Sequence, residues 1–201
     1  MIIIQPYNRD WPAQFISARQ RLREILGHLA VGIEHIGSTA VPGLGAKDVI
    51  DIQVSVKSLT PGILDALNAS GWRARLGDPD IFDGMASESP ELTKYYAREP
   101  KGDSQRIHVH IREVGRFNHR FALLFRDFLR ADENARAQYQ TFKRQAALAY
   151  PNDINGYLAL KAPVFNLLYR MAETWAAMTH WDESRYTGFV SDSVSRDEPP
   201  S

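Results

Sequence analysis

The sequence predicts an α+β fold, with a mixed β-sheet packed by helices and a helical C-terminal segment. Two β-branched runs, residues 31–36 and 48–56, flank a turn rich in glycine and proline. Two further strand-like segments cover residues 93–97 and 105–112. From residue 118 onward, helical periodicity replaces them. Strands gathered in the first half and helices in the second are typical of an α+β domain.

The helices are predicted from apolar spacing and from residues that favour helix ends. Residues 11–29 carry apolar side chains at three- and four-residue steps. A short helix over residues 59–70 has Thr60 as its N-cap and Pro61 in its first turn. Three longer helical segments follow in the C-terminal half: residues 118–131, 133–149 and 154–178.

Pro163 falls within the last of these helical segments, where it predicts a kink or the first turn of a helix. Beyond residue 179 the chain becomes rich in serine, aspartate and proline. We therefore expect one domain over residues 1–180 and a flexible tail over residues 181–201.

The composition excludes several classes of protein. Lys plus Arg and Asp plus Glu both number 24, so net charge predicts no general binding of nucleic acid and no membrane partner. The chain has no cysteine, which excludes disulfides, thiolate zinc sites and a cysteine nucleophile. The N-terminus lacks the basic region of a signal peptide, and no apolar stretch approaches the ~20 residues of a membrane span. We expect a cytoplasmic protein.

The turn between the first two strands has the features of a phosphate-binding loop. Gly37 permits a backbone path that a side chain would block, and Ser38 adds a hydroxyl beside exposed N–H groups. Lys47 ends the turn, where it either reaches a phosphate or is an ordinary solvated lysine. Asp51 lies on the following strand, as a carboxylate for Mg²⁺ or as a cap for the turn amides.

These motifs resemble the GrpB family, a small member of the DNA polymerase beta-like nucleotidyltransferase superfamily. The resemblance rests on residues 34–44 and 47–51, and it continues through residues 108–110, 125–130 and 157–161. It implies a nucleotidyltransferase-like sheet that binds a nucleoside triphosphate and a divalent metal, Mg²⁺ or Mn²⁺ or alternatively Zn²⁺. The implied reaction transfers a nucleoside monophosphate to a small-molecule acceptor. Fusion of such domains to dephospho-coenzyme A kinase also suggests a role linked to coenzyme A.

One position departs from the superfamily pattern. Superfamily enzymes carry a second acidic residue two positions after the first, whereas this chain has Gln53 after Asp51. A neutral amide is a poor substitute for a carboxylate at a two-metal site. Standard two-metal catalysis is therefore in doubt from the sequence alone.

A later strand contributes a stripe of basic side chains. His108 and His110 alternate, so they point to the same side of that strand, as do Arg106 and Arg112. With Asp51 the two histidines would form a catalytic or metal-binding set, because imidazole is a ligand for transition metals and an acid or base near neutral pH. The alternatives are phosphate binding or ordinary strand histidines. The whole stripe suits an acidic or phosphorylated ligand.

Other candidates come from the resemblance and from strand alternation. Lys143, Tyr157 and Lys161 lie on the predicted C-terminal helices, where related enzymes place triphosphate-binding lysines and base-stacking aromatics. The alternative is that they are ordinary residues of amphipathic helices. Alternation across the turn places His35 with the site and Glu34 on the opposite face.

Three functions remain open at this point. The first is nucleotidyl transfer to a small molecule. The second is non-catalytic binding of a nucleotide or phosphorylated metabolite. The third is metal-dependent hydrolysis of a phosphoester by Asp51, His108 and His110. The sequence does not indicate an oligomeric state.

Overall fold

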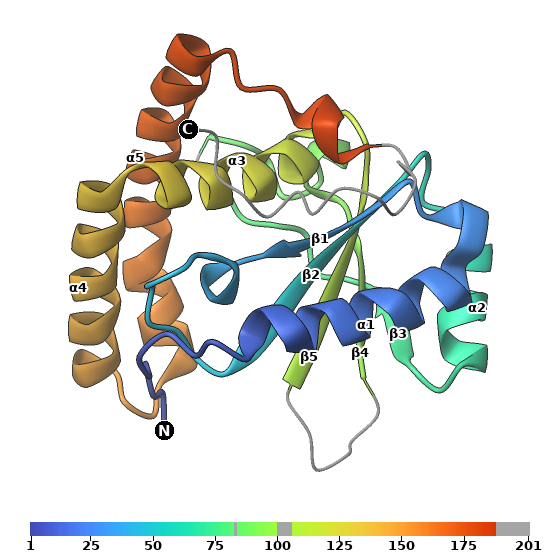
Figure 1. Cartoon of the computed structure of the whole chain (residues 1–201), viewed down its shortest axis with the longest axis horizontal. Coiled ribbons are helices and arrows are strands. Elements are labelled where there is room, and N and C mark those ends of the chain that lie inside the picture. Colours follow the sequence, from blue (N-terminus) through green and yellow to red (C-terminus); the bar gives the residue numbers. More distant parts are fainter. Residues whose placement is uncertain (83, 100–105, 188–201) are drawn as a thin grey trace.

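The computed structural model describes residues 1–82, 84–99 and 106–187. Within them, five strands form one sheet of order β1-β2-β5-β4-β3 (Figure 1). The strands are β1 (Gly32–Ile36), β2 (Val49–Val56), β3 (Arg73–Leu76), β4 (Tyr95–Arg98) and β5 (Arg106–Glu113). Strands β2 and β5 are parallel, and the other neighbours are antiparallel. The predicted mixed sheet is confirmed.

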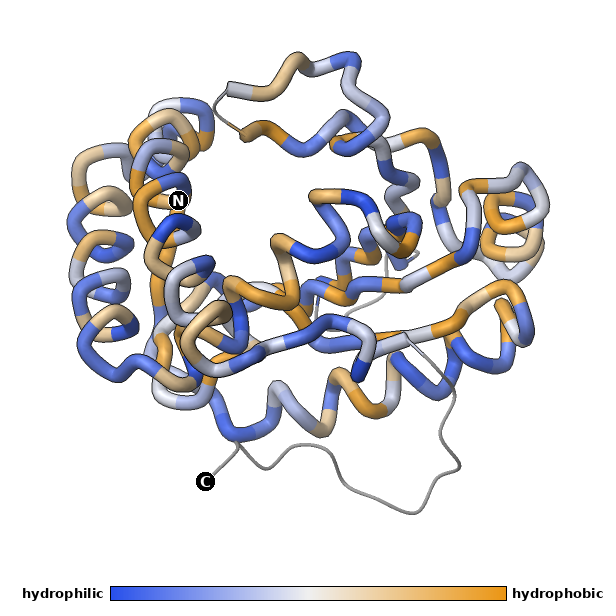
Figure 2. Tube along the Cα trace, turned by 90° about the horizontal axis from the view of Figure 1, so that it is seen from above, coloured by the Kyte–Doolittle hydropathy of each residue, from blue (hydrophilic) through white to orange (hydrophobic). Residues whose placement is uncertain are grey.

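Helices surround this sheet, which confirms the α+β class and the helical C-terminal segment. They are α1 (Trp11–Leu26), α2 (Pro61–Ala69), α3 (Phe117–Ala131), α4 (Glu133–Ala149) and α5 (Ile154–Thr179). Helices α4 and α5 stand side by side at one end of the molecule, with α2 at the other (Figures 1 and 2). Figure 2 also shows that α4 is largely hydrophilic along its outer side.

Local signals account for the helix boundaries. Asp132 caps α4 by accepting from the Ala135 amide, and Asp153 caps α5 by accepting from the amides of its first turn. Pro163 lies in the interior of α5, and the helix continues past it. Within the described part of the chain, no helix has the length and apolar character needed to cross a membrane.

The two faces of the sheet have different chemistry. On one face, β2 presents Ile50, Ile52 and Val54, which are buried against α1 and α2. On the other face it presents Asp51 and Gln53, and the register places them beside His108 and His110 of β5. The polar face is thus the one on which the candidate site residues gather. Side chains of α3, α4 and α5 lie against this polar face of the sheet.

The segment after α5 packs on the domain. The Trp181 indole and the Tyr186 hydroxyl both donate to the Asp127 carboxylate on α3, at 2.9 and 2.6 Å. The Tyr186 carbonyl lies so close to Gly32 that a Cβ there would approach it to 2.2 Å. Residues 181–187, which we expected in a flexible tail, are therefore held against α3 and β1. The rest of that expected tail, 188–201, lies outside the described residues.

Candidate functional site

The site is centred on Asp51, which lies directly against the turn after β1. Gly37 adopts a φ of 71°, and a Cβ at this position would lie 2.6 Å from Asp51 Oδ2. Glycine is therefore required for the backbone conformation and for the close approach of the carboxylate. Ser38 follows on the same turn and is partly exposed. The Asp51 side chain keeps 30% of its surface exposed, so a ligand can reach it.

Both strand histidines lie beside this carboxylate. His108 Nδ1 is 3.7 Å and His110 Nε2 3.5 Å from Asp51 Oδ1. The Tyr96 ring of β4 packs edge-on against both imidazoles, with centroids 5.6 and 5.4 Å away. The structure thus brings the three residues together as the strand alternation predicts. Their catalytic and metal-binding roles stay predictions.

Burial sets the protonation of this group. It lowers the pKa of His108 to about 4, and it also lowers the pKa of His110, although Asp51 opposes both shifts. Burial alone would raise the pKa of Asp51, but His110, His108 and Lys161 together hold it below its usual value. At neutral pH the site therefore contains one carboxylate and two uncharged imidazoles.

Two lysines supply positive charge next to Asp51. Lys47, at the end of the turn, lies with its Nζ 5.5 Å from the centre of the Tyr157 ring on α5. Burial and the charge of Lys47 lower the pKa of Lys161 to about 8, and Asp51 opposes the shift. With this pKa the Lys161 amine is largely protonated at neutral pH, and burial also lowers the pKa of Lys47 while Asp51 opposes that shift. Exposed Arg106 at the start of β5 lies within electrostatic reach of Lys47.

Lys143 is placed differently from the prediction that it binds a triphosphate. Its side chain is buried, and its Nζ donates to the Gly45 carbonyl at 2.5 Å. Burial, followed by the nearby charges of Lys161 and Lys47, lowers its pKa to about 6. The amine is therefore mostly neutral at pH 7, and it holds the 41–46 segment of the turn against α4. The sequence could not show this, because its partner is a backbone carbonyl far away in the chain.

Replacing Lys143 by methionine should raise the stability of the protein at pH 7 and lower it at pH 10. In the unfolded chain the amine is protonated below about 10.4, whereas in the folded protein it loses its proton near pH 6. Folding must therefore release a proton between these values, so the lysine costs stability at pH 7, and this cost disappears as the pH rises. We expect Lys143→Met to gain about 2 kcal/mol at pH 7 and to lose about 1 kcal/mol at pH 10. Urea unfolding of both proteins at the two pH values measures this, and a variant less stable at both would contradict it.

Arg112 is likewise committed to protein partners rather than free for a ligand. Its guanidinium donates to Asp80 Oδ2 at 3.0 Å and to Gln53 Oε1 at 2.8 Å. Lys94 also pairs with Asp80. Asp80 is thereby fastened to the sheet, and Arg112 is held by protein partners instead of being free for a ligand. Asp80 lies in a loop without a recognisable motif, so nothing in the sequence indicates this pairing.

The donor set does not fit a two-metal centre. Gln53, at the position of the second acid, is 0% exposed, and its amide donates to the His119 carbonyl while its oxygen accepts from Arg112. Asp51 is therefore the one carboxylate at this position of β2. Among the described residues, no group of three or more His, Cys, Asp or Glu side chains is arranged to hold a metal ion.

The prediction that His35 faces the site and Glu34 lies opposite is wrong. The register pairs Ile36 with Asp51, so His35 lies on the other face of the sheet. There it stacks on the Phe15 ring at 4.9 Å and hydrogen-bonds Thr39 at 3.0 Å. The strand alternation does not continue across the turn at Gly37, so it cannot assign the faces of His35 and Glu34.

Tyr96 and Tyr139 are two residues of the site that the sequence reasoning missed. Tyr96 shares a sheet face with His110, its register partner, and Tyr139 reaches the turn from α4. Strand alternation on β4 would have found Tyr96 if the pairing of β4 with β5 had been known. For Tyr139 the sequence holds no signal beyond an ordinary apolar helix position.

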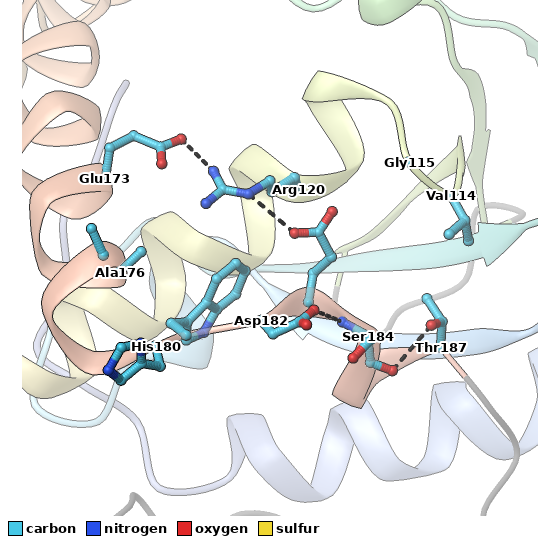
Figure 3. Close-up of a pocket in the computed structure, with 12 residues that line it drawn as sticks. Val114, Gly115, Arg120, Glu173, Ala176, His180, Asp182, Ser184 and Thr187 are labelled. Carbon is cyan, nitrogen blue, oxygen red and sulfur yellow. Dashed lines mark hydrogen bonds and ion pairs between the residues drawn. The ribbon is translucent and has the colours of Figure 1, made fainter.

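A separate cavity of about 700 Å³ lies at the C-terminal end of α5 (Figure 3). Arg120 lies between Glu173 and Glu183 there and pairs with both. None of the site residues around Asp51 lines this cavity. Its lining carries one arginine against three acidic side chains, Glu173, Asp182 and Glu183, so it does not favour an anionic ligand as the lysines near Asp51 do.

Comparison with known proteins assigns this chain to a family. The family model described as "GrpB protein" matches residues 1–171. The chain belongs to the GrpB family. The crystal structure of the conserved protein GrpB from Enterococcus faecalis matches with a TM-score of 0.65 and 28% identity, over 90% of this chain and 100% of that one. A weaker likeness, with a TM-score of 0.46 and 15% identity, links 78% of this chain to 48% of Cid1.

Sequence relatives of this GrpB-family protein have two kinds of name. A dephospho-CoA kinase of Mycolicibacterium paratuberculosis is 39% identical over 191 residues, which cover 88% of this chain and 47% of the kinase. The UPF0157 protein SCO7215 of Streptomyces coelicolor is 37% identical over 163 residues, covering 80% of this chain and 78% of that protein. The chain thus spans about half the length of the dephospho-CoA kinase that it matches.

Proposed function

We propose that this protein binds a nucleoside triphosphate, or another small molecule with linked phosphates, in the site around Asp51. The observation that carries the proposal is the placement of Lys47 and Lys161 within electrostatic reach of Asp51, which itself lies against the Gly37–Ser38 turn. The lysine ammonium groups supply positive point charges, and the turn supplies a hydroxyl and backbone N–H groups. An anion with several phosphates suits such an arrangement.

The charges of the surrounding strands support an anionic ligand. The positive charges of Arg98 and Arg106 lie within electrostatic reach of His108. The imidazoles of His108 and His110 are themselves neutral at pH 7. One carboxylate, Asp51, therefore lies among several cations while its side chain stays 30% exposed. An added phosphate group would relieve the repulsion between the lysines as well as gain attraction.

An aromatic cluster lies next to the lysines. Lys161 Nζ lies 4.3 Å from the centre of the Phe165 ring. Phe165 in turn stacks on Phe125 at 4.6 Å between centroids and packs with Phe121 at 6.0 Å. Because these rings pack against one another and against Lys161, the proposal depends on the phosphates of the ligand and not on stacking of a base.

Binding of ATP and of inorganic tripolyphosphate, measured by titration calorimetry with and without EDTA, tests the proposal. Because the lysines provide the charge, we expect both ligands to bind and EDTA to change the affinity by less than about threefold. Replacing Lys161 by methionine should weaken binding about tenfold or more, as for loss of a charged hydrogen bond. Lys57→Met is the matched control: this exposed lysine follows β2 at the end away from Asp51, and its loss should leave the affinity unchanged. Absence of saturable binding to the unaltered protein would refute the proposal.

Nucleotidyl transfer to a small-molecule hydroxyl is a second candidate, favoured by the rigid placement of Asp51 against the turn. In that reaction a divalent metal would support attack on the α-phosphate, but the chain offers one carboxylate where a two-metal centre needs two. Pyrophosphate release from nucleoside triphosphates with Mg²⁺ or Mn²⁺, lost in Asp51→Asn, would support transfer. Release of phosphate without any acceptor would favour the hydrolase instead.

A further inference from the structure

The hydroxyl of Tyr139 is buried next to the proposed site, where its interaction with the Ser38 hydroxyl falls short of an ordinary hydrogen bond. The residue is 2% exposed, and no hydrogen bond of ordinary geometry reaches its oxygen from any described residue. Leaving a buried hydroxyl unsatisfied costs about 1–3 kcal/mol. Native proteins keep few such groups, and each one calls for a physical reason.

The surroundings of the ring prevent this hydroxyl from turning to another partner. The rings of Phe125 and Phe165 pack edge-on against Tyr139, with centroids at 5.7 and 5.8 Å. The Nζ of Lys143 lies 5.1 Å from the centre of the same ring. The position of the phenol oxygen is therefore fixed by packing on several sides, which is how binding sites hold their polar groups.

The fixed oxygen points toward the turn that the proposed phosphate site uses. Its polar neighbours are the hydroxyl of Ser38, the hydroxyl of Tyr157 and the carboxylate of Asp51. Of these three, Ser38 is the one that interacts with Tyr139 as a hydrogen-bonding side chain, and its hydroxyl can both accept and donate. Burial raises the pKa of Tyr139 well above its usual value, so the phenol keeps its proton and remains a donor.

We propose that Tyr139 is a positioning residue for the phosphorylated ligand and acts through Ser38. In the complex, the Tyr139 hydroxyl donates to Ser38 Oγ, and the Ser38 hydroxyl donates to a phosphate oxygen. The inference rests on the proposed function, because it concerns the same site. It adds a residue that neither the sequence motif nor the family resemblance indicates.

The chemistry of a serine hydroxyl explains why such a residue is useful. Serine has one hydrogen to donate, and it can point to solvent, to the backbone or to the ligand. When Tyr139 donates to Ser38 Oγ, that oxygen acts as acceptor on one side, and its own hydrogen is directed to the other side. Hydrogen bonds linked in this way also polarise one another, which strengthens the bond to the phosphate.

The experiment compares Tyr139→Phe with the unaltered protein, using tripolyphosphate as the probe. The substitution removes one oxygen and keeps the ring packing, so the free protein should be as stable as before or more stable. We expect the Kd for tripolyphosphate to rise about fivefold to tenfold, the range of one net hydrogen bond. Tyr169→Phe is the control: it removes a hydroxyl that donates to Glu173, so it should lose stability and leave the Kd unchanged.

A double-mutant cycle with Ser38→Ala separates action through Ser38 from a general effect. If Tyr139 acts through Ser38, Tyr139→Phe should change the Kd by less than twofold once Ser38 is alanine, and Ser38→Thr should restore most of the affinity. Additive effects, or an unchanged Kd in Tyr139→Phe alone, would overturn the inference. Failure of the unaltered protein to bind tripolyphosphate would instead refute the proposed function, so the two failures are distinguishable.

Discussion

Replacing Arg126 by methionine is expected to lower the free energy of unfolding by about 3–5 kcal/mol, as for removal of one partner of a buried ion pair. Arg126 is 2% exposed and donates to Asp127 at 2.8 Å and to the His35 carbonyl at 2.9 Å. It also approaches Glu34, at 3.5 Å. Without the guanidinium, Asp127 keeps only the more distant Arg130, at 3.9 Å, as an ion-pair partner, and Glu34 loses its ion pair. Chemical unfolding at pH 7 measures the loss.

An exposed ion pair provides the control for this experiment. Glu133 pairs with Arg136 at 3.4 Å, but its side chain is 88% exposed. Because exposed pairs contribute little, Glu133→Gln should change stability by less than about 0.5 kcal/mol. The two substitutions change charge by one unit each, so the difference between them reports burial. A loss below 1 kcal/mol in Arg126→Met would show that Asp127 and Glu34 do not depend on the guanidinium.

The second large effect is expected from Gly37→Ala, which should abolish ligand binding. The new Cβ would lie 2.6 Å from Asp51 Oδ2 and 3.1 Å from Asp51 Cβ, so the carboxylate side chain has to move away from the turn. The φ of 71° and ψ of −170° lie in a region essentially restricted to glycine, which adds a backbone cost of about 1–3 kcal/mol for any residue with a Cβ. We expect a loss of stability of that size or more. Affinity for ATP should fall by at least about a hundredfold, because the turn and Asp51 no longer keep their mutual position.

Gly43→Ala is the matched control for this substitution. Gly43 lies in the same segment with a φ of 78°, but a Cβ there would meet nothing within 4 Å. It should therefore carry a backbone cost for its positive φ and keep the ligand affinity. Calorimetric titration of both variants with ATP separates contact from strain. Equal affinities in the two variants would show that the approach of Asp51 to Gly37 has no part in binding.

Much of the fold could be predicted from the sequence because it depends on local patterns. The β-branched runs, the turn between them and the apolar spacing of the helices are readable over short stretches, and the predicted 133–149 helix matches α4. The placement of His108 and His110 on one side of their strand also follows from local alternation. Their position next to Asp51 required the pairing of β2 with β5, which the sequence could only suggest.

The predicted site differs from the structure where a side chain pairs with a distant part of the chain. Arg112 was predicted from the basic stripe of its strand and Lys143 from the family resemblance, but Asp80 and the Gly45 carbonyl bind them. Tyr139 was missed because nothing in a helical pattern distinguishes a packed ring from one that leaves its hydroxyl unpartnered. Such pairings depend on tertiary packing and on burial, which a single sequence does not contain.

The parallel pairing of β2 with β5 has a consequence for biosynthesis. The hairpin that carries Gly37 and Asp51 leaves the ribosome early, but its partner strand begins only at Arg106, and Lys161 follows later still. Closing so long a stretch of chain is entropically costly and slow. A nascent chain therefore holds Lys47 and Asp51 well before Lys161, and the group of charges around Asp51 is complete only when the final helix has been made.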